Sequence, residues 1–268
     1  MVMTDRKQWR TGLSVGFVGP VDESVMEAYA KAQIKSMEIS LPAEYYDNEL
    51  DWKSLPKWSK NTGTETWSIH LPIGRMLIAY HDRSLCDDAV KRYCEYLDKA
   101  GEAGIKVAVV HPSGEPIHDA DRPEMMQLCL DNLGILCERA KKVGMQIAAE
   151  VLPRTCLCNC QEEVKYFLDR LPDLRVCLDT NHLLKETSQS MVRAVGDKII
   201  TLHVSDYDFV DEKHSWPGDG LIDWKSLQDE LEKADYNGPF LYELSARDMD
   251  GRRTLEDLRA NHLWLMNL

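Results

Sequence analysis

The chain has 268 residues, 44% of them hydrophobic, and its 45 acidic and 32 basic side chains give a formal net charge of −13. This length and apolar content are sufficient for one large core, so we expect a single domain over residues 1–268. The negative charge repels phosphate backbones and anionic lipid surfaces, which disfavours nucleic acid and membranes as partners.

Eight short apolar runs have the length and composition typical of buried β-strands. They begin at Leu13, Ile34, Trp67, Ile105, Met145, Arg175, Ile199 and Phe240. The runs are too apolar for one face to lie in water, which indicates a parallel sheet covered by helices.

Amphipathic stretches with helix-capping signals separate these runs. We expect one helix capped by Ser84 that runs toward Gly101, and one with Pro123 in its first turn that ends at Gly144. Four further helices are expected after Asn159, Thr187, Asp223 and Thr254.

Strands that alternate with helices predict an α/β fold, specifically a single (β/α)8 TIM barrel. The alternative is an open doubly wound sheet, which needs a glycine-rich phosphate-binding turn after an early strand. The early segment GFVGP at residues 16–20 lacks the GxGxxG pattern and is followed by acidic residues. The barrel is therefore the predicted fold.

Seven of the eight predicted strands end in a carboxylate or an imidazole. These residues are Glu38, His70, His111, Glu150, Asp179, His203 and Glu243. Because the carboxyl ends of all barrel strands meet at one mouth, the seven side chains should be neighbours. Charged groups brought together in such a mouth are costly unless they are paired or bind a metal, so the cluster predicts a cation.

The donor atoms narrow the choice of cation. Glu150, Asp179, His203 and Glu243 offer three carboxylates and one imidazole. This set suits one divalent ion, Mn²⁺, Mg²⁺, Co²⁺ or Zn²⁺, with open positions for water or substrate oxygens.

Four segments together carry a family resemblance: AAEVLPR, CLDTNHLL, LHVSDYD…HSWPGDGLIDW and LYELS. They resemble the xylose isomerase-like sugar phosphate isomerase/epimerase family, which includes D-tagatose 3-epimerase and inosose isomerase and is related to endonuclease IV. The resemblance covers nearly the whole chain, from about Leu13 to the last strand. It implies that Glu150, Asp179, His203 and Glu243 are the metal ligands of an isomerase or epimerase, and that the same positions carry an acid/base pair.

The chemistry of these groups fits a carbohydrate substrate. A divalent ion that chelates the carbonyl and neighbouring hydroxyl of an α-hydroxy ketone or aldehyde stabilises the enediolate oxyanion. If Glu150 and Glu243 approach from opposite sides, one removes the carbon-bound proton and the other returns it, which inverts the centre. Delivery of the proton to the adjacent carbon gives aldose–ketose isomerisation instead, so both outcomes remain open.

The remaining polar residues near the predicted mouth have less specific roles. We predict substrate contacts from His70 and His111 on the far side of the mouth, and from His182 and His214. For His182, a role in capping the following helix is the alternative. Glu38 either orients a ligand or hydrogen-bonds the barrel wall, and Trp216 either shields the mouth from water or packs under the last helix.

Two other functions remain open. The segment EKH at residues 212–214 departs from the epimerase pattern, in which an arginine often occurs, and is similar to the segment that supplies an additional zinc in endonuclease IV. Glu212 and His214, together with His70, His111 and His182, therefore suggest a multi-zinc phosphodiesterase. The negative net charge of the chain opposes this function, because a nucleic-acid backbone is also negatively charged. A sugar-binding barrel without catalysis is the third class, although pure binding needs no opposed pair such as Glu150 and Glu243.

The sequence also bears on the cellular location and the oligomeric state of the protein. Residues 1–12 contain no apolar signal-peptide core, and no run of the chain approaches the length of a membrane span. Most of the eight cysteines fall in helical or strand patterns, and CLCNC at residues 156–160 lacks a paired CxxC spacing. We therefore expect a soluble, cytoplasmic protein with reduced thiols, and a homo-oligomer is compatible with this sequence.

Overall fold

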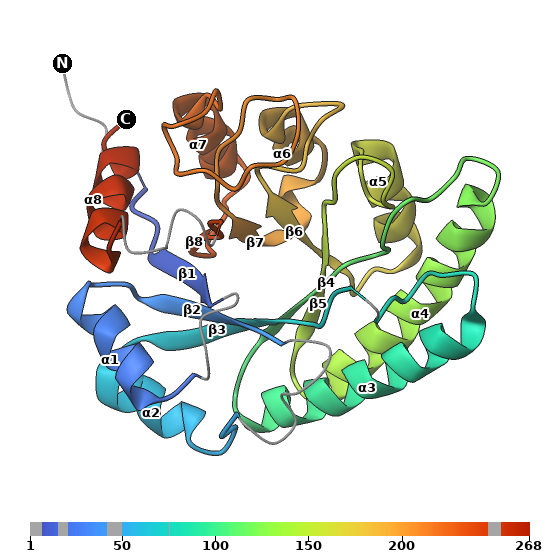
Figure 1. Cartoon of the computed structure of the whole chain (residues 1–268), viewed down its shortest axis with the longest axis horizontal. Helices are drawn as coiled ribbons and strands as arrows, with labels where there is room; N and C mark the ends of the chain where they lie inside the picture. The colour runs from blue at the N-terminus through green and yellow to red at the C-terminus, as the bar shows by residue number, and fades with distance from the viewer. Residues whose placement is uncertain (1–6, 16–20, 42–49, 75, 246–252) are drawn as a thin grey trace.

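The computed structural model describes residues 7–15, 21–41, 50–74, 76–245 and 253–268 (Figure 1). These residues form one sheet of eight parallel strands in the spatial order β7-β6-β5-β4-β3-β2-β1-β8. The strands are β1 (Thr11–Val15), β2 (Ser36–Ser40), β3 (Glu65–His70), β4 (Val107–Val110), β5 (Gln146–Glu150), β6 (Arg175–Asp179), β7 (Ile199–His203) and β8 (Phe240–Tyr242).

Main-chain contacts join the two ends of this sheet. The amide of Val204, just after β7, donates a hydrogen bond to the carbonyl of Leu241 in β8 at 2.8 Å. The amide of Glu243 donates to the carbonyl of Val204 at 3.2 Å. The sheet therefore closes on itself, and the predicted TIM barrel is confirmed.

Helices surround the barrel (Figure 1). They are α1 (Glu23–Lys31), α2 (Leu55–Thr62), α3 (Arg83–Glu102), α4 (Arg122–Lys142), α5 (Gln161–Arg170), α6 (Ser188–Val195), α7 (Trp224–Lys233) and α8 (Leu255–Met266), with a 3-10 turn at Gly196–Lys198. Each helix buries apolar residues against the sheet, as Leu133 and Leu136 of α4 illustrate. None of the helices in the described ranges combines the length and apolar character needed to cross a bilayer.

All eight predicted strands are present. Because helices cover the outside of the sheet and side chains fill the barrel, a strand such as β4 is buried along its whole length, and its sequence is the continuous apolar run VAVV. The predicted first strand continues beyond β1 into residues 16–20, which lie outside the described residues. Helices α1 and α2 are additional to those predicted individually.

Two predicted helix caps are wrong. Helix α3 is capped by Asp82, whose Oδ1 accepts a hydrogen bond from the Ser84 amide at 3.0 Å, so Ser84 lies within the first turn. Cys160, not Asn159, precedes α5, and the Asn159 amide group donates to the carbonyl of Arg154 at 2.6 Å. Ser84 lies two residues after the actual N-cap of α3, and Asn159 lies one residue before the actual N-cap of α5.

The other predicted helix signals agree with the structure. The side chains of Thr187, Asp223 and Thr254 each accept a hydrogen bond from a backbone amide of the first turn of α6, α7 and α8. Pro123 lies in the first turn of α4, which ends at Lys142, just before the predicted end.

The WPGDG segment after β7 is held by one buried carboxylate, that of Asp206. Its Oδ2 accepts hydrogen bonds from the Gly218 amide at 2.8 Å and from Trp224 Nε1 at 2.9 Å, and its Oδ1 accepts from the Ile222 amide at 3.1 Å. A Cβ atom on Gly220 would overlap Asp206 Oδ1. The glycine therefore allows the loop to close around the carboxylate.

Trp216 is buried beside Arg253, which lies just before α8. The side chain is 2% exposed, and the guanidinium carbon of Arg253 lies 4.7 Å from its ring centroid. The next residue, Pro217, accepts a hydrogen bond at its carbonyl from Asn261 of α8 at 2.8 Å. Trp216 is not among the described residues that line the cavity. Packing of this segment under the last helix is therefore supported, and shielding of the mouth stays a prediction.

We predict that Gly220→Ala lowers the free energy of unfolding by about 1–3 kcal/mol, because the methyl group collides with Asp206 and with the backbone of Tyr207. Gly134→Ala, inside α4, is the control because its Cβ would meet only Leu171, at 3.6 Å. That variant should gain roughly 0.4–1 kcal/mol. Urea unfolding followed by circular dichroism measures both, and wild-type stability of Gly220→Ala would contradict the prediction.

Candidate active site

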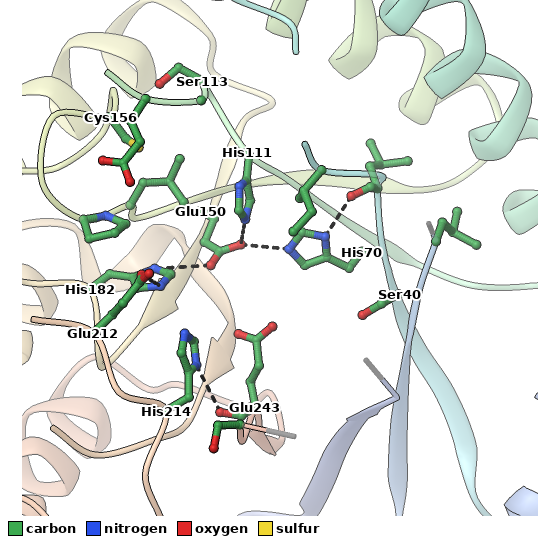
Figure 2. A pocket seen from close by; sticks show the side chains of 18 of the residues that line it. Ser40, His70, His111, Ser113, Glu150, Cys156, His182, Glu212, His214 and Glu243 are labelled. Atoms are coloured by element: carbon green, nitrogen blue, oxygen red, sulfur yellow. Dashed lines mark hydrogen bonds and ion pairs between the residues drawn. The ribbon is translucent and has the colours of Figure 1, made fainter. Parts of the chain in front are cut away.

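The carboxyl ends of the strands surround a cavity of about 710 Å³ (Figure 2). Its polar lining consists largely of carboxylates and imidazoles contributed by separate strand ends and loops. These residues are His70, His111, Glu115, Glu150, His182, Glu212, His214 and Glu243. The barrel thus brings together side chains that are far apart in the sequence.

Four of the strand-end residues form a compact cluster beneath this cavity. Glu150, Asp179, His203 and Glu243 each offer a nitrogen or oxygen atom, and these atoms all lie within 4.8 Å of one another. They stand at the ends of β5, β6 and β7 and directly after β8. Glu150, Asp179 and His203 are buried, whereas the Glu243 side chain is 27% exposed. These are the four residues predicted to bind a metal.

The Glu150 carboxylate contacts four histidine side chains. Its Oε2 is 3.0 Å from His70 Nε2 and 3.1 Å from His111 Nε2 (Figure 2). Its Oε1 is 3.4 Å from the Nδ1 atoms of both His182 and His203. Burial alone would raise the pKa of Glu150, but the charges of His111 and His203 outweigh burial and lower this pKa well below its ordinary value. The surrounding imidazoles therefore favour the ionised form of Glu150.

This arrangement changes the expected position of two histidines. His70 and His111 lie directly against Glu150 rather than across the mouth from it. Nδ1 of His70 is 2.8 Å from the carbonyl of Leu71, which fixes the ring orientation. Both histidines also line the cavity, so a contact with substrate stays a prediction for them.

Asp179 provides the test of whether the cluster fits a cation. Its Oδ1 accepts a hydrogen bond from the Asn181 amide at 2.7 Å. Its Oδ2 is buried and has no hydrogen-bond partner, since His182 and His203 are 3.6 and 3.9 Å away. Burial raises the pKa of Asp179 to about 6, against the opposing charge of His182. A buried carboxylate oxygen without a partner is unfavourable, and a divalent ion held by the four residues would satisfy it.

Glu38 holds His203 in place from behind. Glu38 Oε1 lies 3.1 Å from His203 Nε2, and the opposite ring atom, Nδ1, is 2.9 Å from Glu243 Oε2. Glu38 also accepts hydrogen bonds from Ser14 at 3.1 Å and from Ser68 at 2.7 Å. Burial would raise the pKa of Glu38, but His203 lowers it. The hydrogen bonds of Glu38 to the barrel wall are therefore confirmed, and its contact with His203 keeps the orientation of a ligand as a prediction.

Arg154 is a cavity residue that was not predicted from the sequence, although it lies in the AAEVLPR motif. Its guanidinium pairs with Glu115 at 2.7 Å, Asp211 at 2.7 Å and Glu212 at 2.9 Å (Oε1), which links the loops after β4, β5 and β7. Glu212 Oε2 lies 3.3 Å from His182 Nε2, and this contact is the main reason that the pKa of Glu212 falls to about 2. Glu212 therefore connects Arg154 to the histidines of the site.

His182 and His214 form the far side of the polar lining. His182 Nδ1 is 3.0 Å from the Val151 carbonyl, and His214 Nδ1 is 3.3 Å from the Glu243 carbonyl. Burial would lower the pKa of His182, but Asp179 and the contact with Glu212 outweigh burial and raise this pKa to about 10. Because Thr187 caps α6, the alternative role of His182 as a helix cap is wrong.

We predict that Glu38→Gln weakens divalent-metal binding about 10- to 100-fold, because it removes the charge that orients His203. The measurement is calorimetric titration of the metal-free protein with Mn²⁺ and Zn²⁺. Glu65→Gln is the matched control, since Glu65 begins β3 at the opposite end of the barrel and pairs with Ser36 and Arg10. Equal affinities for Glu38→Gln and the wild type would show that His203 does not depend on Glu38.

Comparison with known proteins agrees with this architecture. A family model described as the xylose isomerase-like TIM barrel matches residues 26–268. The chain therefore belongs to that family, and the resemblance drawn from its motifs is confirmed.

Individual relatives share low sequence identity with this chain. An uncharacterized protein of Methanocaldococcus jannaschii is 21% identical over 184 residues, which cover 69% of this chain and 72% of that protein. Fructoselysine 3-epimerase of Escherichia coli O157:H7 is 29% identical over 142 residues, or 48% of this chain and 51% of the epimerase. A D-tagatose 3-epimerase-like protein has a crystal structure with a TM-score of 0.80 and 20% identity, covering 96% of this chain and 98% of that one. The structural similarity shows the shared fold.

Proposed function

We propose that this protein is a divalent metal-dependent isomerase or epimerase that acts on sugars or sugar-like polyol ketones by proton transfer. The observation that carries the proposal is the cluster of Glu150, Asp179, His203 and Glu243 at the base of a cavity, with a buried Asp179 oxygen that has no partner. The similarity to fructoselysine 3-epimerase and to a D-tagatose 3-epimerase-like structure supports the reaction class.

Glu150, Asp179, His203 and Glu243 would hold the ion, with Mn²⁺, Mg²⁺, Co²⁺ and Zn²⁺ as candidates. When bound, a divalent ion supplies Lewis-acid stabilisation of the oxyanion that develops as the carbon-bound proton leaves. Glu38 would keep His203 oriented for this role, since its carboxylate occupies the other side of the imidazole.

We assign the proton transfers to Glu150 and Glu243. Burial would raise the pKa of Glu243, but His203 lowers it below its ordinary value, which favours the form that accepts a proton, as it does for Glu150. One, as the carboxylate, removes the proton from the carbon next to the carbonyl, and the other, after taking up a proton from solvent, delivers that proton to the opposite face. Because the two groups interact, their titrations belong to the pair rather than to either residue.

The cavity histidines would position the substrate. His182 and His214 line the cavity on the side of the loops after β6 and β7, and His70 and His111 line it beside Glu150. Their ring nitrogens are suited to hydrogen bonds with substrate hydroxyls. The proposal keeps one domain, a cytoplasmic location, and no nucleic-acid or membrane partner as expectations from the sequence.

One observation favours a second candidate, the multi-zinc phosphodiesterase. Asp179, His182 and His214 form another group whose donor atoms lie within 4.8 Å of one another. Against it, Glu212 is already paired with Arg154, and the formal charge of −13 opposes a nucleic-acid backbone. We therefore rank it second.

The test is deuterium exchange. The purified protein, loaded in turn with each candidate metal, is incubated in D₂O with ketoses, inososes and their phosphates, and the products are followed by NMR. We expect deuterium on the carbon next to the carbonyl. Glu150→Gln and Glu243→Gln should each slow this exchange by about 10²- to 10⁴-fold, since each removes a proton-transfer group.

Glu65→Gln again serves as the matched control and should exchange at the wild-type rate. Undiminished exchange in both site variants would contradict the assignment of the carboxylates. No exchange with any compound, together with nicking of abasic DNA by the zinc-loaded protein, would favour the phosphodiesterase instead.

A further inference from the structure

The segment after β7 carries two residues that line the cavity, Glu212 and His214. A short antiparallel bridge joins its ends: the amide of Asp206 donates to the carbonyl of Ser215 at 2.8 Å, and the amide of Ser215 donates back at 3.0 Å. Residues 206–215, which we call the β7 loop, therefore form a closed loop beyond the end of β7.

His214 has an unfavourable backbone conformation within the β7 loop. Its φ is 49°, in the left-handed region that residues with a Cβ atom seldom adopt. Such a conformation persists only where the surrounding contacts fix it, and it occurs preferentially at functional sites. His214 therefore depends on partners that hold its backbone.

The side chain of Asn181 is one of these partners. Its Oδ1 accepts hydrogen bonds from the amides of Lys213 at 2.9 Å and His214 at 3.1 Å. The carbonyl of His214 accepts a hydrogen bond from the Ser245 amide at 3.0 Å, so the backbone is held on both sides. Asn181 is fully buried and is not among the described residues that line the cavity. It can therefore act on a bound substrate only through the β7 loop.

The backbone of Asn181 is tied to the carboxylate cluster. Its amide donates to Asp179 Oδ1 at 2.7 Å. The hydroxyl of Thr180, between these two residues, accepts from the Ser205 amide at 3.1 Å and donates to the Ser205 carbonyl at 2.7 Å. A substitution of the Asn181 side chain would leave the backbone bond to Asp179 in place, so the loop and the carboxylate can be tested separately.

The fixed backbone determines how the His214 ring faces the cavity. Its Nδ1 is 3.3 Å from the Glu243 carbonyl, and because a carbonyl oxygen can only accept, Nδ1 is the donor. Nε2 is then the ring atom left for a substrate hydroxyl. In Figure 2 this second nitrogen points away from the Glu243 carbonyl, into the pocket. A change in the backbone at His214 would move it from this position.

We propose that Asn181 is a positioning residue of the candidate active site: its Oδ1 holds the β7 loop in the conformation in which His214 contacts the substrate. This inference rests on the proposed function for the presence of a sugar-like substrate. Because Asn181 acts through main-chain amides, its side chain governs the loop and the affinity for substrate, and leaves the affinity for the metal unchanged.

Limited trypsin proteolysis tests the hold on the loop without any substrate. The Lys213 side chain is 50% exposed, but cleavage after Lys213 requires the loop to open locally, because Asn181 binds the amides on either side of that residue. Asn181→Leu keeps the size of the side chain and removes the acceptor. We expect it to be cut after Lys213 about tenfold faster than the wild type, as measured by mass spectrometry of the fragments. Asn181→Asp keeps an acceptor oxygen and should be cut at the wild-type rate.

Asn132→Leu is the matched control. Asn132 is buried in α4, its Nδ2 donates to the Ile78 carbonyl at 2.7 Å, and it is not among the cavity residues. The control also loses a buried hydrogen bond to a loop carbonyl, so it should unfold more easily than the wild type. Cleavage after Lys213 should nevertheless stay at the wild-type rate, which separates the role of Asn181 from a general loss of stability.

Steady-state kinetics tests the effect on the substrate, with the metal-loaded protein and the ketohexose that exchanges fastest in D₂O. Asn181→Leu should raise KM about tenfold with a smaller change in kcat, because the contact of His214 holds the substrate before and during the reaction. In the His214→Ala background the same substitution should change KM by less than about twofold, since the contact that it supports is already absent. The affinity for Mn²⁺ and the KM of Asn132→Leu should match the wild type.

Wild-type cleavage after Lys213 in Asn181→Leu would overturn the inference whether or not the protein is an isomerase. Faster cleavage with an unchanged KM would also overturn it, since the loop would then be held without any effect on the substrate. No turnover of any ketose by the wild type would contradict the proposed function instead, and the cleavage rates would still decide whether Asn181 holds the loop. If Asn181→Leu does not fold, Asn181→Ser, whose shorter side chain cannot reach both amides, replaces it in each measurement.

Discussion

The structure depends on one electrostatic constraint, the convergence of Glu38, Glu150, Asp179 and Glu243 around the imidazole of His203. The Glu38, Glu150 and Asp179 side chains are buried, where isolated carboxylates are strongly unfavourable. His203 and the surrounding histidines offset the charge of Glu38, Glu150 and Glu243, and these three pKa values are lowered. Asp179 is the exception, with a raised pKa and a carboxylate oxygen that lacks a partner. The simplest physical account of this imbalance is a cation bound among Glu150, Asp179, His203 and Glu243.

The sequence predicted the barrel and the positions of the cluster because both depend on local pattern. Strands buried on both faces must be apolar, so a polar residue at the end of each run, such as Glu150 after QIAA, stands out. Closure of the barrel then brings these ends together whatever their separation in the chain. The two wrong helix caps, at Ser84 and Asn159, are errors of one or two residues where several polar side chains compete for the same turn.

The sequence did not predict the contacts between side chains that point toward one another from different strands and loops. The link between Glu38 and His203 joins β2 to β7, and no local spacing distinguishes it from a carboxylate that only bonds the wall. Arg154 is an ordinary loop residue until three loops place Glu115, Asp211 and Glu212 around it. The link between the Trp216–Gly220 loop and α8 likewise depends on tertiary contacts, the hydrogen bond from Asn261 to Pro217 and those that Asp206 accepts. Such contacts arise from tertiary packing, which propensity and periodicity do not encode.

The most direct test of the central claim is crystallographic. Crystals grown with Mn²⁺ and measured near the manganese absorption edge would locate the ion by its anomalous scattering. The account predicts one strong peak in contact with Glu150, Asp179, His203 and Glu243, with Asp179 Oδ2 as a ligand. A peak bound elsewhere, or these four side chains fully ordered around no ion at saturating manganese, would contradict it.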